Sequence, residues 1–82
     1  MSKRNFDVDY LAELQVDSLP PPERKALAKL FSIAEMERSA ETWRTAEGQF
    51  ISRLGSRRRV LWKRSPDGRP IILSIVDQSY AA

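Results

Sequence analysis

The spacing of apolar residues along this chain changes from helical to alternating at Gly48. Before Gly48, a helix beginning at the prolines of residues 20–22 is predicted by apolar residues three and four apart: Leu27, Leu30, Phe31 and Ala34. After Gly48, turn residues separate three segments whose alternation is typical of strands, residues 50–54, 58–64 and 71–76. The second turn contains Asp67-Gly68, a pair favoured in hairpins. The pattern therefore predicts three consecutive antiparallel strands after at least one helix.

Two segments before Gly48 have a less regular pattern. In residues 5–14, Phe6 and Val8 alternate with polar neighbours, and a helical spacing follows at Tyr10, Leu11 and Leu14. We predict a short strand or extended arm that passes into a helix there. Residues 37–47 either continue as a helix or return irregularly, with Trp43 expected to be their apolar anchor.

Length and composition indicate a small domain with simple chemistry. With 82 residues, 41% of them hydrophobic, the chain can form one domain over residues 1–82. We expect an α+β fold with N-terminal helices packed on a small antiparallel sheet. The chain has no cysteine and no histidine, which argues against disulfides and the usual zinc sites, so we expect neither metal nor cofactor. It has no apolar stretch near the ~20 residues of a membrane span and no recognisable signal peptide, so we expect a cytoplasmic protein without membrane contact.

Positive charge is concentrated in the last part of the sequence. Residues 49–82 contain two acidic residues and seven basic ones, namely Arg53, Arg57, Arg58, Arg59, Lys63, Arg64 and Arg69. Their net charge is +5, whereas residues 1–48 carry −2. A basic segment on a nearly neutral chain favours a phosphate-rich partner such as nucleic acid, with acidic lipid or simple solubility as alternatives.

Alternation within the predicted strands divides this charge between two faces of a sheet. Neighbouring side chains point to opposite faces, so Arg59 and Lys63 lie on one side and Val60 and Trp62 on the other. The segment 71–76 is apolar on both faces, which suits a central strand with helices over one side. The other side is then expected to be a shallow surface rimmed by Arg53, Arg57, Arg59 and Lys63.

The order of these segments resembles that of a known protein family. A Leu-Pro-Pro sequence opens a helix, an aromatic residue precedes a Glu-Gly turn, and three strand motifs flank an acidic-Gly turn. In this chain they are residues 19–21, 43–48, 52–55, 59–62, 67–68 and 71–76. Together they are similar to the RelE/HigB/ParE superfamily of bacterial toxins, most of all its phage-derived HigB-like branch.

The resemblance implies a RelE/ParE-like toxin fold and a role in a type II toxin–antitoxin system. It implies a toxin that cleaves mRNA on the ribosome as a metal-independent endoribonuclease and so inhibits translation. It also implies a cognate antitoxin protein that covers the basic surface in a toxin–antitoxin hetero-oligomer. At the matching motif positions, Arg53 and Arg59 would contact the scissile phosphate, and Tyr80 would match a tyrosine that many members carry. Gln78 stands where the family usually has lysine, a departure that bears on catalytic strength.

Cleavage of RNA by its own 2′-hydroxyl requires a base, an acid and positive charge beside the crowded phosphate. Since histidine is absent, we assign the catalytic roles to Arg53, Arg59, Lys63 and Tyr80. The arginines would stabilise charge, and Lys63 or Tyr80 would transfer protons. Further RNA contacts are assigned to Arg57, Arg58, Arg64 and Gln78. Both tryptophans are expected to pack in the core or on a sheet face, although an exposed one beside arginines could stack on a base.

Three other functions remain open at this point. Residues 26–47 can form helix, turn, helix, with the hairpin at residues 66–68 as the wing of a winged-helix DNA-binding protein. Residues 35–47 are acidic for a recognition helix, which disfavours this alternative. With the toxin fold retained, the chain could inhibit gyrase as the ParE branch does, or bind a target through a catalytically degenerate site.

Overall fold

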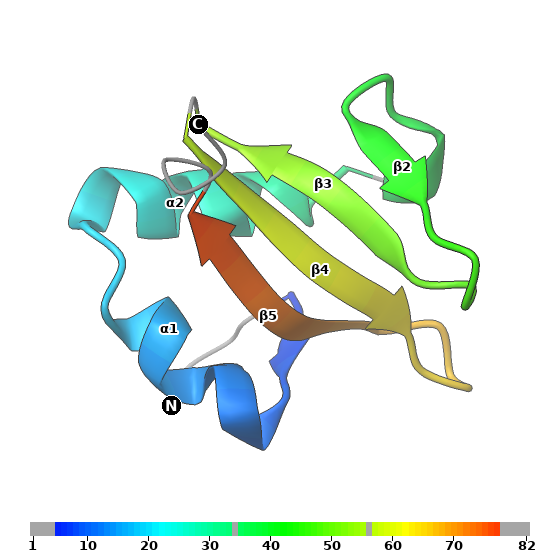
Figure 1. Ribbon diagram of the computed structural model, residues 1–82, viewed down its shortest axis with the longest axis horizontal. Coiled ribbons are helices and arrows are strands. Elements are labelled where there is room, and N and C mark those ends of the chain that lie inside the picture. Colours follow the sequence, from blue (N-terminus) through cyan, green and yellow to red (C-terminus); the bar gives the residue numbers. More distant parts are fainter. Residues whose placement is uncertain (1–4, 34, 56, 78–82) are drawn as a thin grey trace.

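The computed structural model describes residues 5–33, 35–55 and 57–77 of the chain. Its centre is a five-stranded sheet in the order β1-β5-β4-β3-β2 (Figure 1). The strands are β1 (Asp7–Val8), β2 (Thr42–Arg44), β3 (Phe50–Leu54), β4 (Arg58–Arg64) and β5 (Pro70–Asp77). β1 runs parallel to β5, and the other neighbouring strands are antiparallel. The predicted α+β class and the three consecutive antiparallel strands are confirmed.

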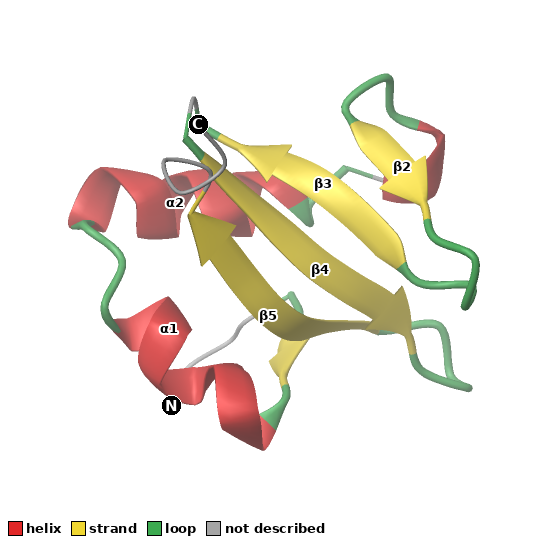
Figure 2. Cartoon of the chain, in the orientation of Figure 1, coloured by secondary structure: helices red, strands yellow, loops and turns green. Residues whose placement is uncertain are grey.

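The helical elements lie between β1 and β2 in the chain (Figure 2). They are η1 (Tyr10–Ala12), α1 (Glu13–Asp17), α2 (Pro21–Leu30) and η2 (Met36–Arg38), where η denotes a 3-10 turn. α2 begins at the prolines as predicted, because their fixed φ and missing N–H suit a first helical turn. It crosses behind β3 and β4 in Figure 1, so the helices cover one face of the sheet. None of the helices in the described ranges is long and apolar enough to cross a membrane.

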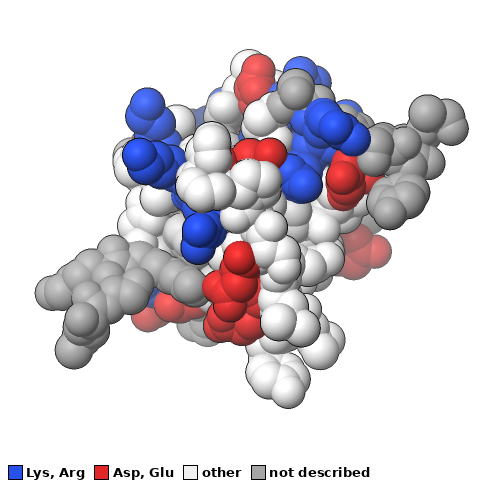
Figure 3. Space-filling view, turned by 90° about the vertical axis from the view of Figure 1, so that its left-hand side faces the viewer, with Lys and Arg blue, Asp and Glu red and all other residues white. Residues whose placement is uncertain are grey.

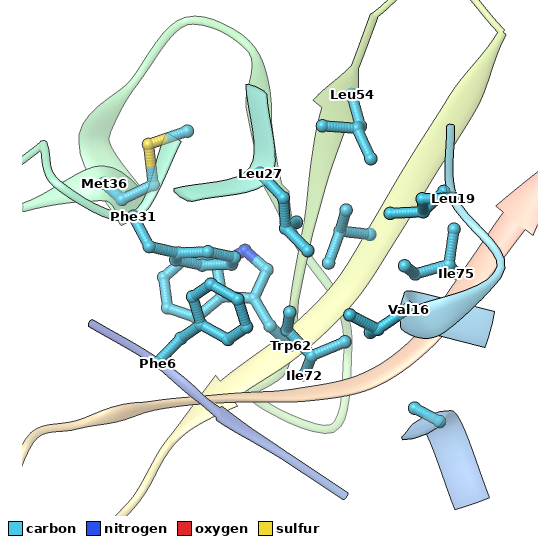
Figure 4. Close-up of a cluster of buried hydrophobic side chains, with 12 residues drawn as sticks. Phe6, Val16, Leu19, Leu27, Phe31, Met36, Leu54, Trp62, Ile72 and Ile75 are labelled. Atoms are coloured by element: carbon cyan, nitrogen blue, oxygen red, sulfur yellow. The ribbon is translucent and has the colours of Figure 1, made fainter. Parts of the chain in front are cut away.

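The core lies between the helices and the sheet and is centred on Trp62 (Figure 4). The Trp62 ring meets Phe31 of the helical layer edge-on, with centroids 5.2 Å apart, and contacts Phe50 of β3 at 4.8 Å. Around these rings pack other buried apolar residues, including Leu27, Leu54, Val60, Ile72 and Ile75. The burial of Val60 and Trp62 confirms that they share the helix-covered face, as the alternation predicts.

The segment before Gly48 differs from the prediction. Residues 37–47 form the end of η2 and the edge strand β2, with no longer helix among them. Glu35 has a positive φ of 55°, a left-handed conformation that interrupts a helical path. The helix-turn-helix interpretation therefore lacks its second helix. Trp43 was also wrongly assigned as an apolar anchor: it pairs with Ile51 on the edge strand and is 41% exposed.

The N-terminal segment contains the predicted short strand and helix, but the helix turns its large apolar residues outward. β1 is followed directly by η1 and α1, as expected for an arm that passes into a helix. The residues that face the core are Ala12 and Val16. Tyr10, Leu11 and Leu14, whose spacing predicted the helix, are exposed instead.

Candidate nucleic-acid interface

The uncovered side of the sheet carries the candidate site. We call it the open face and define it by six residues from three strands: Trp43, Ile51, Arg53, Arg59, Leu61 and Lys63. Strand alternation turns these side chains away from the buried residues Ser52, Val60 and Trp62. Cross-strand pairing places Trp43 beside Ile51 and Ile51 beside Leu61, which gives the face an apolar middle.

Two arginines lie directly opposite each other on the open face. The register of β3 and β4 pairs Arg53 with Arg59. Like charges in this position destabilise a sheet, whereas an anion between them would be stabilised by both. Guanidinium groups also match the geometry of a phosphate by donating two hydrogen bonds at once. The pair therefore has the charge and the donors that a phosphodiester group requires.

The aromatic ring of Trp43 lies next to this arginine pair. The Arg59 guanidinium carbon lies 5.0 Å from the centroid of the Trp43 ring, a cation–π contact across β3. Trp43 pairs with Ile51 across the strands, and its neighbour Thr42 shares a hydrogen bond of 2.6 Å with the buried Ser52 hydroxyl. Ser52 also accepts a hydrogen bond from the Trp62 indole N–H at 2.8 Å. This chain of hydrogen bonds ties the edge strand to the core beneath the open face.

Lys63 lies on the same face but at a distance from the arginine pair. It is four residues from Arg59 on β4, which separates the two Cα atoms by roughly 13 Å at strand spacing. Arg57 precedes β4 in the turn and is exposed. In the part of the chain that the structure describes, no ion pair involves Arg53, Arg57 or Lys63. Arg53, Arg57 and Lys63 are all exposed, so their positive charges are accessible, and Lys63 is set apart from the arginine pair along β4.

The structure does not bring Arg58 and Arg64 to the open face. Both alternate with Arg59 and Lys63, so they share the side of the sheet that the helices cover. Arg58 forms an ion pair with Glu23 of α2 and lies 4.0 Å from the Asp77 carboxylate. Their assignment as RNA-binding residues thus has no geometric support, because both guanidinium groups are used within the fold.

Arg64 is held by Glu37, the middle residue of η2. Its Nε and Nη2 atoms donate to the two Glu37 carboxylate oxygens at 2.9 and 2.7 Å. These hydrogen bonds lower the pKa of Glu37 to about 2 and raise the pKa of Arg64. The pair connects η2 to β4 at the end of the sheet and so supports the fold.

The remaining predicted site residues lie outside the described residues: these are Gln78 and Tyr80. Within the described residues, no cluster of three or more acidic side chains could hold a metal ion. Sequence reasoning missed the place of Trp43 on the open face. A signal for it existed, since Thr42 and Trp43 are residue types enriched in strands and precede a turn that returns to Phe50.

Comparison with known proteins adds no family assignment. No protein-family model matches this chain, and no curated protein matches it. A functional proposal therefore depends on the fold, on the open face and on the motif order described above.

Proposed function

We propose that this chain is the toxin of a type II toxin–antitoxin system and that its open face binds and cleaves mRNA on the ribosome. The observation that carries the proposal is the Arg53–Arg59 pair on the uncovered side of the sheet, beside an exposed tryptophan. The resemblance to the RelE/HigB-like toxins supports it, because the two arginines stand at motif positions of that family.

The open face suits single-stranded RNA better than a duplex. Single strands are bound where basic side chains follow the backbone and aromatic rings stack on unpaired bases. Here the arginine pair would hold one phosphate and Trp43 would stack on an adjacent base. Lys63 would hold a further phosphate along β4. An extended strand lying across β2, β3 and β4 would meet all of these groups, whereas paired bases could not reach the tryptophan.

The proposed chemistry needs no metal. The ribose 2′-hydroxyl oxygen attacks the neighbouring phosphorus, the bond from phosphorus to the 5′-oxygen breaks, and a 2′,3′-cyclic phosphate and a 5′-hydroxyl result. Arg53 and Arg59 would stabilise the negative charge that builds on the phosphate oxygens. Tyr80 would take the proton from the 2′-hydroxyl and give a proton to the departing 5′-oxygen, while Lys63, four residues along β4 from Arg59, would bind the next phosphate. The ribosome would align the 2′-hydroxyl for attack.

The proposed inhibitor of this activity is a cognate antitoxin. An acidic segment laid over the open face would pair with the same arginines and exclude RNA. The resulting complex would be a toxin–antitoxin hetero-oligomer.

The decisive experiment is inducible expression in a bacterial host, with growth and transcript ends followed within minutes. Wild type should arrest growth and produce new cuts in translated messages. Arg59→Ala should lose both effects, because one half of the phosphate site is removed. Arg24→Ala is the matched control: it removes an exposed arginine from the helix side and should remain toxic. Circular dichroism of the purified variants verifies that each one folds.

Other outcomes of this experiment would indicate one of the alternative functions. Growth arrest with intact transcripts and DNA damage would contradict RNA cleavage and indicate a gyrase inhibitor. Normal growth with transcripts intact would indicate a binding protein with a degenerate site. Binding can be measured separately on single-stranded RNA by fluorescence anisotropy at several salt concentrations. With three cations in contact, we expect log K to fall with log salt at a slope of about −2, and Arg53→Ala to reduce that slope by roughly 0.7.

A further inference from the structure

A second exposed surface lies on the helix side of the sheet and is apolar. It consists of Tyr10, Leu11 and Leu14, whose exposed fractions are 87%, 80% and 79%. We call these three residues the η1–α1 patch. The same helical segment buries Ala12 and Val16, so its larger apolar side chains face solvent and smaller ones face the core. Three such side chains expose on the order of 500 Å² together, the size of patch that is often functional in a monomer.

The surroundings of the η1–α1 patch are acidic. Residues 5–19 contain four carboxylates and no lysine or arginine. Asp7 is paired with Arg69 at 2.9 Å, and Asp9, Glu13 and Asp17 lie along the patch. Figure 3 shows Asp and Glu side chains beside uncharged ones in the lower half of the view, with most Lys and Arg in the upper half. This charge is opposite to that of the open face.

Hydrogen bonds attach the segment that carries the patch to β5. Gln15, on the same helix, donates a hydrogen bond to the Ile75 carbonyl at 3.0 Å and accepts one from the Ile75 N–H at 3.1 Å. The Asp9 N–H donates to the Ile72 carbonyl at 2.8 Å, and the Asp9 carboxylate caps η1. Both ends of the helical segment are thus fastened to β5. A partner would meet a preformed surface, which lowers the entropy lost on binding.

We propose that the η1–α1 patch is a docking site for a positively charged amphipathic segment of a partner protein. Apolar residues of that segment would cover Tyr10, Leu11 and Leu14, and its lysines or arginines would face the surrounding carboxylates. The acidic surroundings disfavour nucleic acid as the occupant. They also disfavour a second copy of this chain across a two-fold axis, because equal carboxylates would then face each other. The proposal does not depend on the function of the open face.

Peptide selection provides the test. Random peptides of about 16 residues, roughly four helical turns, would be displayed on phage and selected on the wild-type protein. We expect enriched peptides to carry net positive charge and apolar residues at helical spacing. They should bind the double variant Leu11→Ser, Leu14→Ser at least about tenfold more weakly, since its anchoring side chains are removed. Glu13→Lys, which keeps the apolar residues, should also weaken binding.

The matched control is Ile33→Ser, which removes another exposed apolar side chain, 54% exposed, away from the patch. It should bind the selected peptides as wild type does, and NMR shift changes on peptide addition should centre on residues 9–17. The proposal is overturned if the enriched peptides are acidic, if they bind the double variant equally well, or if the shift changes map to the open face. Sedimentation showing a wild-type dimer that Leu11→Ser dissociates would also overturn it, in favour of self-association.

Discussion

Ser52 connects the core to the edge strand of the candidate interface through two hydrogen bonds. Its side chain is fully buried, accepts the Trp62 indole N–H at 2.8 Å and shares a hydrogen bond of 2.6 Å with Thr42 on the edge strand. Ser52→Ala removes the acceptor and leaves the indole N–H in the core without a partner. The substitution changes little else, because only one oxygen atom is lost.

The expected loss of stability follows from the free energy that a buried donor without a hydrogen-bond partner costs. Such a group costs about 1–3 kcal/mol, and the N–H of Trp62 has no route to solvent because the residue is fully buried. Thr42 is half-buried and can turn its hydroxyl toward water, so its contribution is smaller. We therefore expect Ser52→Ala to lower the free energy of unfolding by about 2 kcal/mol, which corresponds to a fall in Tm of roughly 8–16 °C for a domain of this size.

Urea denaturation followed by circular dichroism measures this loss. Thr42→Ser is the control within the same chain of hydrogen bonds, and it should cost less than about 1 kcal/mol because both the Ser52 hydroxyl and the Trp62 indole keep their partners. A double-mutant cycle of Ser52→Ala with Trp62→Phe isolates the buried bond, and we expect a coupling of about 1 kcal/mol or more. A loss below about 0.5 kcal/mol for Ser52→Ala, or no coupling in the cycle, would refute the reasoning.

Two further predictions concern the stability of the fold. Glu37→Gln should destabilise the protein by about 1–2 kcal/mol at neutral pH, after allowance for solvent screening of its half-exposed pair with Arg64. Folding lowers the pKa of Glu37 from 4.5 to about 2. The difference in free energy of unfolding between wild type and variant is therefore complete above pH 4.5 and should disappear as the pH falls toward 2. Urea denaturation across that pH range measures it. Leu27→Ala in the core should cost about 2–5 kcal/mol by the same assay, whereas Leu14→Ala on the exposed patch should cost less than about 0.5 kcal/mol; equal losses would contradict the burial pattern.

Much of the open face was predictable from strand alternation. Arg53 and Arg59 each lie next in sequence to a residue that the structure buries, so a strand must turn them to the opposite side. The same rule, applied to every position, would have excluded Arg58 and Arg64, since they alternate in phase with Val60 and Trp62. Their inclusion among the RNA-binding residues came from positive charge alone, which does not specify a face.

The edge strand was not predictable in the same way. Residues 42–44 form a strand because Thr42 and Trp43 pair with Ser52 and Ile51. Three residues carry too little local preference to specify a strand, and most of the stabilisation comes from the cross-strand partners. The residue types at positions 42 and 43 favoured a strand, but the contact between Trp43 and Arg59 follows from the cross-strand pairing and could not be predicted from them.

The amino-acid sequence by itself determined the α+β class, the start of α2 at the prolines, the three consecutive strands and the two faces of β4. These features depend on backbone preferences and side-chain periods that neighbouring residues encode. Only the tertiary structure decided the partners of Arg58 and Arg64, the outward turn of Tyr10, Leu11 and Leu14, and the attachment of Gln15 to Ile75. Gln15 and Ile75 are 60 residues apart in the chain. Such contacts depend on which surfaces packing brings together, and local pattern contains no information about them.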